Sequence, residues 1–303
     1  MEIIRIKNKN FIELKEPTCA AIGNFDGVHL AHQILINESK KHNLKSAVIT
    51  FSPHPSVYLK RMPNYPLITP IDKKIEIINE FNVDYLIIIE FDDIIASMPK
   101  EEFISNLKKM NIKAIVCGYD FSFGRRGEGE ATDLKDDFDL TIIKKYIYDD
   151  VRVSSTYIRE LLDIGNVYEA NRLLGREFSV RGEVVYGSQK GRVIGFPTAN
   201  VDYKNYYLPQ NGVYFVNLIV KGEKYLGMCN IGHNPTFNFA ANKRMEVNIF
   251  DFNKDIYGEI VEVYFVRRIR DEKKFKSVDE LLIQMNSDKE KCLEIYNDLK
   301  KEN

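Results

Sequence analysis

Apolar positions are distributed in two different ways along the chain, and the change divides it into two parts. In the first part, short continuous apolar runs alternate with segments whose apolar residues recur at helical spacing. Strands are expected at Cys19–Ile22, Ser46–Phe51, Val83–Ile89 and Ala114–Cys117, and helices from Val28, at Ile71–Phe81 and from Pro99 to Met110. This alternation is typical of a parallel sheet with helices on both faces, in which ligands collect at the carboxyl ends of the strands.

After about residue 175, β-rich runs separated by glycine-containing turns replace this alternation. The runs are Glu183–Tyr186, Val213–Val220, Met245–Phe250 and Ile260–Val266, and Lys221-Gly222-Glu223 reads as a hairpin turn. The chain ends in an amphipathic helical pattern from Val278 to about Lys301. We expect a small antiparallel β-barrel closed by one helix, with a domain boundary near Leu173–Gly175 that gives domains 1–172 and 173–303.

Composition narrows the classes of function. The 303 residues include 43 Lys and Arg against 44 Asp and Glu, and this net charge of −1 does not supply the positive field of a nucleic-acid binder. The longest apolar run, Tyr85–Ile89, is far short of the ~20 residues of a membrane span. Four cysteines without C-x-x-C spacing indicate free thiols in a reducing cytoplasm. We therefore expect no nucleic-acid or membrane partner, while the oligomeric state stays open.

A first candidate site follows the first predicted strand, where Gly23-Asn24-Phe25-Asp26-Gly27-Val28-His29-Leu30-Ala31-His32-Gln33 leads into a helix. His29 and His32 are three residues apart, so they share a face in the first helical turn. A helix start attracts phosphate, and two imidazoles there can donate hydrogen bonds to a polyphosphate. The pair alone is better explained as polar residues at a helix start. The flanking Gly23, Phe25, Asp26 and Gly27 favour the phosphate site.

Three further loops carry candidate motifs, and each also has a plain structural explanation. The motifs are Thr50-Phe51-Ser52-Pro53-His54-Pro55, Gly118-Tyr119-Asp120-Phe121-Ser122-Phe123-Gly124 and Ser154-Ser155-Thr156-Tyr157-Ile158-Arg159. His54 between two prolines is a rigid turn or a ligand contact, and Phe121 and Phe123 are either core residues or stacking partners. Ser154 and Ser155 can cap a helix, which leaves backbone N–H groups for phosphate beside the fixed charge of Arg159.

In this order, the four segments resemble the bacterial bifunctional riboflavin kinase/FMN adenylyltransferase (FAD synthetase) family, whose first half carries an HxGH-type signature. The resemblance implies a Rossmann-like nucleotidyltransferase domain in which His29 and His32 are catalytic. It implies binding contacts at Gly23, Phe25, Asp26, Gly27, His54, Gly118, Asp120, Phe123, Gly124, Ser154, Ser155, Thr156 and Arg159. Ala31 departs from the family pattern, because it replaces the usual glycine of the signature.

A second candidate site lies in the β-rich part, where the segment from Gly187 to Asn200 matches the flavokinase pattern G-x-x-x-G-R-x-x-G-F-P-T-A-N. It is not a P-loop, because the Gly-Lys-Ser/Thr ending is absent. The resemblance implies that Thr198 and Asn200 hold Mg²⁺ and ATP, and that Glu246 is the general base on the ribityl 5′-hydroxyl. It implies binding contacts at Gly187, Gly191, Arg192, Gly195, Pro197, Thr198, Asn200 and Asn230.

Two features leave the interpretation of the second site undecided. Glu246 is otherwise an outward-facing strand residue, and Asn248 stands where the family usually has histidine. The resemblance as a whole implies two steps, phosphorylation of riboflavin to FMN in the barrel and adenylylation of FMN to FAD, with release of pyrophosphate, in the first domain. ATP is the co-substrate and Mg²⁺ the cofactor of both. Two other interpretations are a riboflavin kinase with weak or lost adenylyltransferase activity and a non-catalytic flavin-binding regulator.

Overall fold

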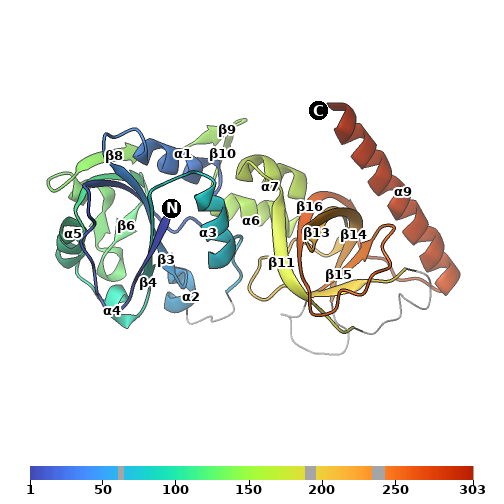
Figure 1. Cartoon of the computed structure of the whole chain (residues 1–303). Coiled ribbons are helices and arrows are strands. Elements are labelled where there is room, and N and C mark those ends of the chain that lie inside the picture. The colour runs from blue at the N-terminus through green and yellow to red at the C-terminus, as the bar shows by residue number, and fades with distance from the viewer. Residues whose placement is uncertain (61–64, 188–195, 234–242, 303) are drawn as a thin grey trace. The chain divides into compact units, whose positions relative to one another are not determined.

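A computed structural model of the protein describes residues 1–60, 65–187, 196–233 and 243–302 (Figure 1). The chain divides into two compact units, Met1–Tyr157 and Ile158–Asn303. Each unit has its own sheet and its own hydrophobic core, so each is described by itself.

The first unit is built on a six-stranded sheet in the order β1-β4-β3-β2-β5-β8, and every neighbouring pair is parallel. Its strands are β1 (Glu2–Ile6), β2 (Thr18–Ile22), β3 (Lys45–Ser52), β4 (Tyr85–Glu90), β5 (Ile112–Gly118) and β8 (Asp139–Ile143). This confirms the predicted parallel α/β domain. The sequence did not predict β1 and β8, which lie at the sheet edges and are less continuously buried than the central strands.

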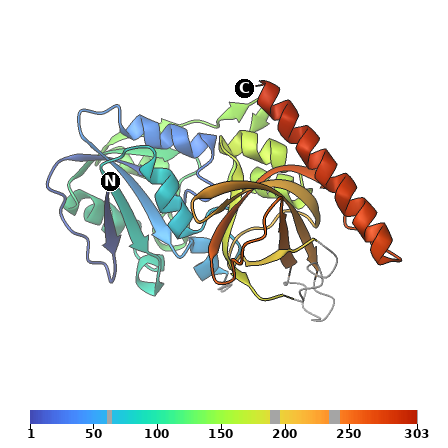
Figure 2. The ribbon, with the colours of Figure 1, turned by 45° about the vertical axis from the view of Figure 1, so that its right-hand side comes forward.

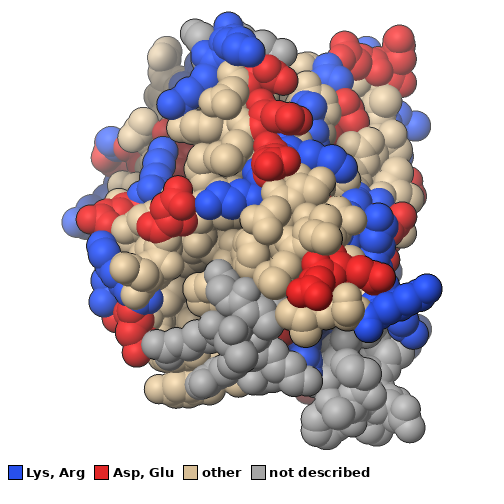
Figure 3. Space-filling model, turned by 90° about the vertical axis from the view of Figure 1, so that its right-hand side faces the viewer, with Lys and Arg blue, Asp and Glu red and all other residues tan. Residues whose placement is uncertain are grey.

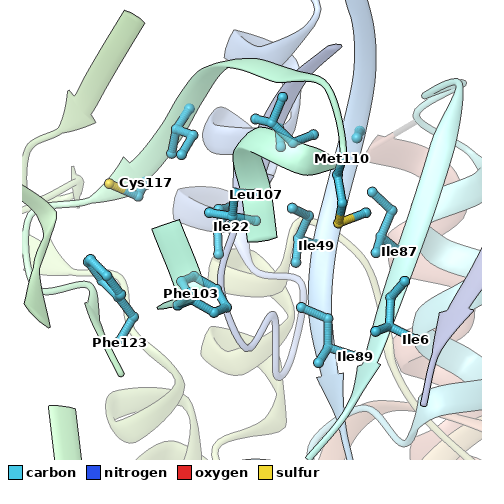
Figure 4. Close-up of a cluster of buried hydrophobic side chains, with 14 of the residues drawn as sticks. Ile6, Ile22, Ile49, Ile87, Ile89, Phe103, Leu107, Met110, Cys117 and Phe123 are labelled. Carbon is cyan, nitrogen blue, oxygen red and sulfur yellow. The ribbon is translucent and has the colours of Figure 1, made fainter. Parts of the chain in front are cut away.

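Helices cover both faces of this sheet, which explains why the central strands are apolar throughout. One face packs against α5 (Lys100–Lys109) through Phe103 and Leu107 (Figure 4). The other packs against α1 (Leu30–Ser39) and α3 (Ile71–Asn79) through Leu35 and Ile77, among others. Successive residues of a strand point to opposite faces, so both must be apolar here.

The remaining elements of the first unit are short. They are the helices α2 (Pro55–Leu59) and α4 (Asp93–Ala96), the paired strands β6 (Ser122–Phe123) and β7 (Gly129–Glu130), the paired strands β9 (Ile147–Tyr148) and β10 (Val151–Arg152), and 3₁₀ turns at Arg125–Gly127 and Ala131–Leu134.

The strand order reverses beside β2. The chain runs from β2 to β3 and β4 on one side and then returns to β5 on the other side of β2. In open α/β sheets, ligands bind in the crevice outside the strand carboxyl ends at such a switch point. The loops that follow β2 and β5 are the Gly23 and Gly118 segments singled out in the sequence.

The second unit contains a closed antiparallel barrel in the order β11-β12-β15-β14-β13-β16, with β16 pairing back to β11 (Figure 2). Its strands are β11 (Phe178–Val185), β12 (Ala199–Asp202), β13 (Gly212–Val220), β14 (Glu223–His233), β15 (Lys243–Ile249) and β16 (Ile260–Arg270). The helix α9 (Val278–Glu302) packs outside the barrel, where Cys292 joins a cluster with Val213 and Phe215. The predicted barrel, its closing helix and the Lys221–Gly222 hairpin turn are confirmed.

Two helices connect the two sheets along the chain, α6 (Ser155–Asp163) and α7 (Val167–Leu174). The division into compact units follows Tyr157, so α7 belongs to the barrel unit. The Asn171 side chain accepts the Phe178 N–H at 2.7 Å and donates to the Phe265 carbonyl at 2.7 Å, which ties α7 to β11 and β16. The predicted limits of the two catalytic domains, 1–172 and 173–303, stay a prediction.

Basic and acidic side chains are intermingled on the face of the molecule shown in Figure 3. This mixture agrees with the nearly balanced charge of the sequence. None of the described helices is both long enough and apolar enough to cross a membrane.

Candidate functional sites

The two histidines of the first site lie against each other at the start of α1. Helix α1 begins at Leu30, two residues later than the pattern predicts, and His29 caps it because its Nδ1 accepts the His32 N–H at 3.3 Å. The two rings stack with centroids 3.6 Å apart and planes 12° apart. Helix N-termini favour anions, so this pair stands where a polyphosphate would be attracted.

The residues just before the histidines shape the loop from within. Phe25 is fully buried and its ring lies 5.1 Å from that of His32. The buried Asp26 carboxylate accepts the Thr69 N–H at 3.0 Å, and the Asp26 carbonyl accepts the Ser155 hydroxyl at 2.7 Å. Gly23 continues β2, since its N–H donates to the Ile49 carbonyl at 3.1 Å. These contacts join three separate segments around the loop.

One residue of this site was missed by the sequence analysis. Lys74 in α3 is only 2% exposed, and its ammonium donates to the Asn24 carbonyl at 2.6 Å. Burial lowers the pKa of Lys74 to about 8, although the nearby Asp26 charge acts in the opposite direction. The helical spacing could have predicted its burial, because Lys74 lies three and four positions before the buried Ile77 and Ile78.

The loop after β3 places His54 at a helix start. The His54 Nδ1 accepts the Ser56 N–H at 3.1 Å and thereby caps α2, and its ring stacks on Tyr65 with centroids 6.2 Å apart. The rigid-turn explanation therefore describes the geometry of His54 well. Its contact with a flavin stays a prediction.

The loop after β5 contains both exposed and core residues. Gly118 ends the strand, and the exposed Asp120 carboxylate lies 3.0 Å from the Arg152 guanidinium. Phe123 is 5% exposed and belongs to the hydrophobic core of the first unit, so its ring packs inward. Gly124 has a φ of +75°, and a Cβ there would lie 3.0 Å from the Lys100 backbone, so glycine is needed for this close approach.

The Ser-Ser-Thr segment starts α6 as predicted. The Ser154 hydroxyl accepts the Tyr157 N–H at 3.2 Å, while the side chain of Thr156 is exposed. Arg159 falls within the second unit, and its guanidinium lies 5.5 Å from the centre of the Tyr207 ring. The capping explanation fits Ser154, and the ligand contacts of the segment stay predictions.

The second site is organised by strand register. Glu246 on β15 is directly paired with Asn200 on β12 and with Asn230 on β14. Residues paired in this way point to the same side of a sheet, so the carboxylate lies between two side-chain amides. The Arg244 guanidinium is 3.7 Å from the Glu246 carboxylate. This row faces out of the barrel, because Val213, paired with Asn230, packs against α9.

Gly187 lies close to the side chain of Asn200 in the same row. A Cβ built at Gly187 would overlap the side-chain amide of Asn200. Only glycine can therefore pass this close to Asn200 without moving it. Gly191, Arg192 and Gly195 lie outside the described residues.

A cavity of about 360 Å³ in the barrel unit is lined in part by Ala199 and Val247, the sequence neighbours of Asn200 and Glu246. Its walls combine the Pro197–Ala199 segment, residues 252–257 and interior strand residues such as Val184 and Val247. The buried Asn248 side chain donates to the Pro197 carbonyl at 2.8 Å and so holds one wall in place. Of the two predicted Mg²⁺ ligands, Thr198 lines the cavity and Asn200 belongs to the row with Glu246.

The donor atoms near this cavity suit a hard cation. The part of the chain that the structure describes has no cluster of three His, Cys, Asp or Glu side chains able to hold a metal ion. Thr198, Asn200 and Glu246 offer oxygen atoms, and Mg²⁺ commonly takes only one or two protein oxygens together with substrate phosphates. This donor set fits a nucleotide-bound Mg²⁺ better than a metal ion held by the protein alone.

Known proteins match the chain in both units. Residues 11–157 match the FAD synthetase family and residues 174–296 the riboflavin kinase family. The chain is 38% identical to the bifunctional riboflavin kinase/FMN adenylyltransferase of Bacillus subtilis (strain 168), over 99% of this chain and 100% of that protein. It is 35% identical to the protein of the same name from Escherichia coli (strain K12), over 93% of this chain and 94% of that protein.

A solved structure is similar over almost the whole chain. It is a crystal structure from Streptococcus pneumoniae described as a macrolide-efflux protein, with a TM-score of 0.88, 38% identity, and coverage of 96% of this chain and 98% of that one. The likeness extends through both units. The efflux description belongs to that protein.

Proposed function

The chain belongs to the bifunctional riboflavin kinase/FMN adenylyltransferase family, and we propose that it makes FMN and FAD from riboflavin at two separate sites. Riboflavin and ATP give FMN and ADP in the barrel unit. FMN and ATP give FAD and pyrophosphate in the first unit. The observation that carries the proposal is that the units hold two different groups of candidate residues, the stacked histidines in one and the Glu246 row in the other.

In the kinase step, Glu246 acts as general base. Its carboxylate accepts the proton of the ribityl 5′-hydroxyl as that oxygen attacks the γ-phosphorus of ATP, and ADP leaves. Asn200 and Asn230 are the partners of Glu246 in strand register on either side. Thr198 and Asn200 would hold the ATP-bound Mg²⁺, which supplies charge neutralisation on the phosphates when it is bound.

In the adenylyl transfer step, an FMN phosphate oxygen attacks the α-phosphorus of ATP. The bond from that phosphorus to the β-phosphate oxygen breaks, and pyrophosphate leaves. His29 and His32 donate hydrogen bonds to the phosphates as negative charge develops, which is the electrostatic assistance expected of preorganised donors. The loop from Gly23 to Gly27 and the start of α6 complete the phosphate-binding region.

A cytoplasmic location is part of the proposal. It is supported by the four cysteines, which are all buried and free of disulfides, as expected for a reducing compartment.

One incubation separates this proposal from its two alternatives. The protein is mixed with riboflavin and Mg-ATP, and riboflavin, FMN and FAD are resolved by chromatography over time. We expect FMN to appear first and FAD to follow. FMN without FAD would indicate a kinase whose adenylyltransferase site is disabled, and unchanged riboflavin would indicate a binding protein without catalysis.

A further inference from the structure

Lys74 is a buried cation that neither proposed step uses. It lies on the same face of α3 as Ile77 and Ile78 and is 2% exposed. A buried ammonium is costly unless its hydrogen bonds and its charge are compensated. An apolar residue would satisfy a purely hydrophobic position here without that cost, so a lysine at this position calls for an explanation.

The contacts of Lys74 lead to the phosphate-binding loop of the first unit. Its ammonium donates to the Asn24 carbonyl at 2.6 Å and lies 3.4 Å from the Thr50 hydroxyl. The Thr50 hydroxyl donates to the same carbonyl at 3.1 Å. Side chains of α3 and β3 therefore both bind the backbone of the Gly23–Gly27 loop, which directly precedes the histidine pair.

We propose that Lys74 is a positioning residue for adenylyl transfer, which fixes the Gly23–Gly27 loop and supplies buried positive charge that favours binding of the ATP polyphosphate. The inference rests on the proposed function of the first unit. It adds a buried cationic group to a site that otherwise consists of the histidine pair and a helix start.

The charge balance around Lys74 gives this role a signature in pH. Burial lowers the pKa of Lys74 to about 8, and Asp26 is the charge that opposes the shift. A bound polyanion would favour the protonated form, so ATP binding should take up a proton and weaken as pH rises through 8.

Other titratable groups near α3 could also contribute to the pH dependence of ATP binding, so their contributions must be distinguished from that of Lys74. Asp72, Lys73 and Glu76 share the helix, and the Lys73 ammonium lies 3.5 Å from the Glu76 carboxylate. From the elements packed against it come Asp26, His29, His32 and Cys19, whose thiol has its pKa raised to about 12 by burial. A variant that changes Lys74 alone isolates its contribution to the pH profile.

The test is the KM for ATP in conversion of FMN to FAD between pH 7.5 and 9.5, a range above the second ionisation of a phosphate monoester. In the wild type we expect KM to rise about sixfold across this range, which corresponds to ~1 unit of pKa coupling between ATP and Lys74. Lys74→Met should have a high KM that does not change with pH. Lys74→Arg should keep a low KM through pH 9.5, because arginine stays protonated.

Lys73→Met is the matched control, since it removes the neighbouring lysine and should reproduce the wild-type profile. Riboflavin phosphorylation by each variant and its thermal unfolding report whether the protein is folded. A wild-type KM that is constant from pH 7.5 to 9.5, or a profile shared by wild type and Lys74→Met, would overturn the role of Lys74. FAD production from FMN at pH 7.5 by the wild type tests the proposed function separately.

Discussion

At the scale of single residues, the kinase site depends on a close approach between the backbone at Gly187 and the side chain of Asn200. Gly187 lies against the Asn200 amide, and Asn200 is paired in register with Glu246. A methyl group at position 187 must displace either the loop or the amide. We therefore expect this site to be sensitive to the addition of a single methyl group at position 187.

We predict that Gly187→Ala lowers riboflavin phosphorylation by roughly 10²-fold, because a displacement of about 1 Å can cost that much in alignment. Conversion of FMN to FAD should stay at the wild-type rate, since it takes place in the other unit. Both rates are measured on one purified protein, which makes the second reaction an internal control. Equal loss of both activities would mean that the substitution unfolds the protein instead.

Ala31 lies between the two histidines, where the family usually has glycine, and its effect on ATP can be measured. We predict that Ala31→Gly binds ATP more tightly in adenylyl transfer, because removal of the methyl group lets the nucleotide lie closer to the start of α1. The same change should cost about 1 kcal/mol of stability, since glycine is a poorer helix former than alanine. Measurements of KM and thermal unfolding check both effects. An unchanged KM would show that the pocket already accommodates the methyl group.

Some residues of the sites were predictable from the sequence and others were not. The H-x-x-H spacing at a strand-to-helix junction predicts that His29 and His32 lie on one face, because local geometry alone brings them together, and the structure adds that their rings stack. Lys74 was missed, since a Lys-Lys pair in a helix usually reads as solvated charge and its burial depends on long-range packing. The pairing of Glu246 with two asparagines depends on strand register, which the motifs did not reveal.

At the scale of elements, the central strands of the first unit were predictable because both faces of the sheet are covered. Their apolar runs are continuous, as burial on both sides requires. The edge strands β1 and β8 carry mixed patterns and were not recognised. The role of α7 was also missed, because its docking onto β16 requires contacts between segments far apart in the chain.

We predict that α7 is needed for a stable barrel fragment. Fragment 158–303 should fold and phosphorylate riboflavin, whereas fragment 173–303 should be much less stable. The shorter fragment loses buried side chains such as Val167 and Ala170 and the Asn171 hydrogen bonds. Burial of one large aliphatic side chain is worth ~1.5–3 kcal/mol, so the loss is a large share of the ~5–15 kcal/mol of a typical domain.

Thermal unfolding and riboflavin kinase rates of the two fragments check this prediction. A fragment 173–303 as stable as fragment 158–303 would show that α7 is dispensable and would favour the boundary predicted from the sequence.

At the scale of the whole molecule, we propose that two independent sites act in succession on a diffusible intermediate. Glu246→Gln should remove the kinase base, with a loss of ~10²–10⁴-fold in FMN formation, and leave adenylyl transfer intact. His32→Ala should remove one phosphate donor but keep the helix cap, because His29 accepts the backbone N–H of residue 32. Loss of one preorganised donor typically costs ~10²–10³-fold.

The most direct measurement combines these two proteins. Riboflavin and Mg-ATP are incubated with Glu246→Gln alone, with His32→Ala alone and with an equal mixture, and the flavins are resolved by chromatography. We predict unchanged riboflavin in the first sample, accumulation of FMN in the second and formation of FAD in the mixture. A mixture that makes no FAD, or a Glu246→Gln protein that makes FMN at the wild-type rate, would contradict the account.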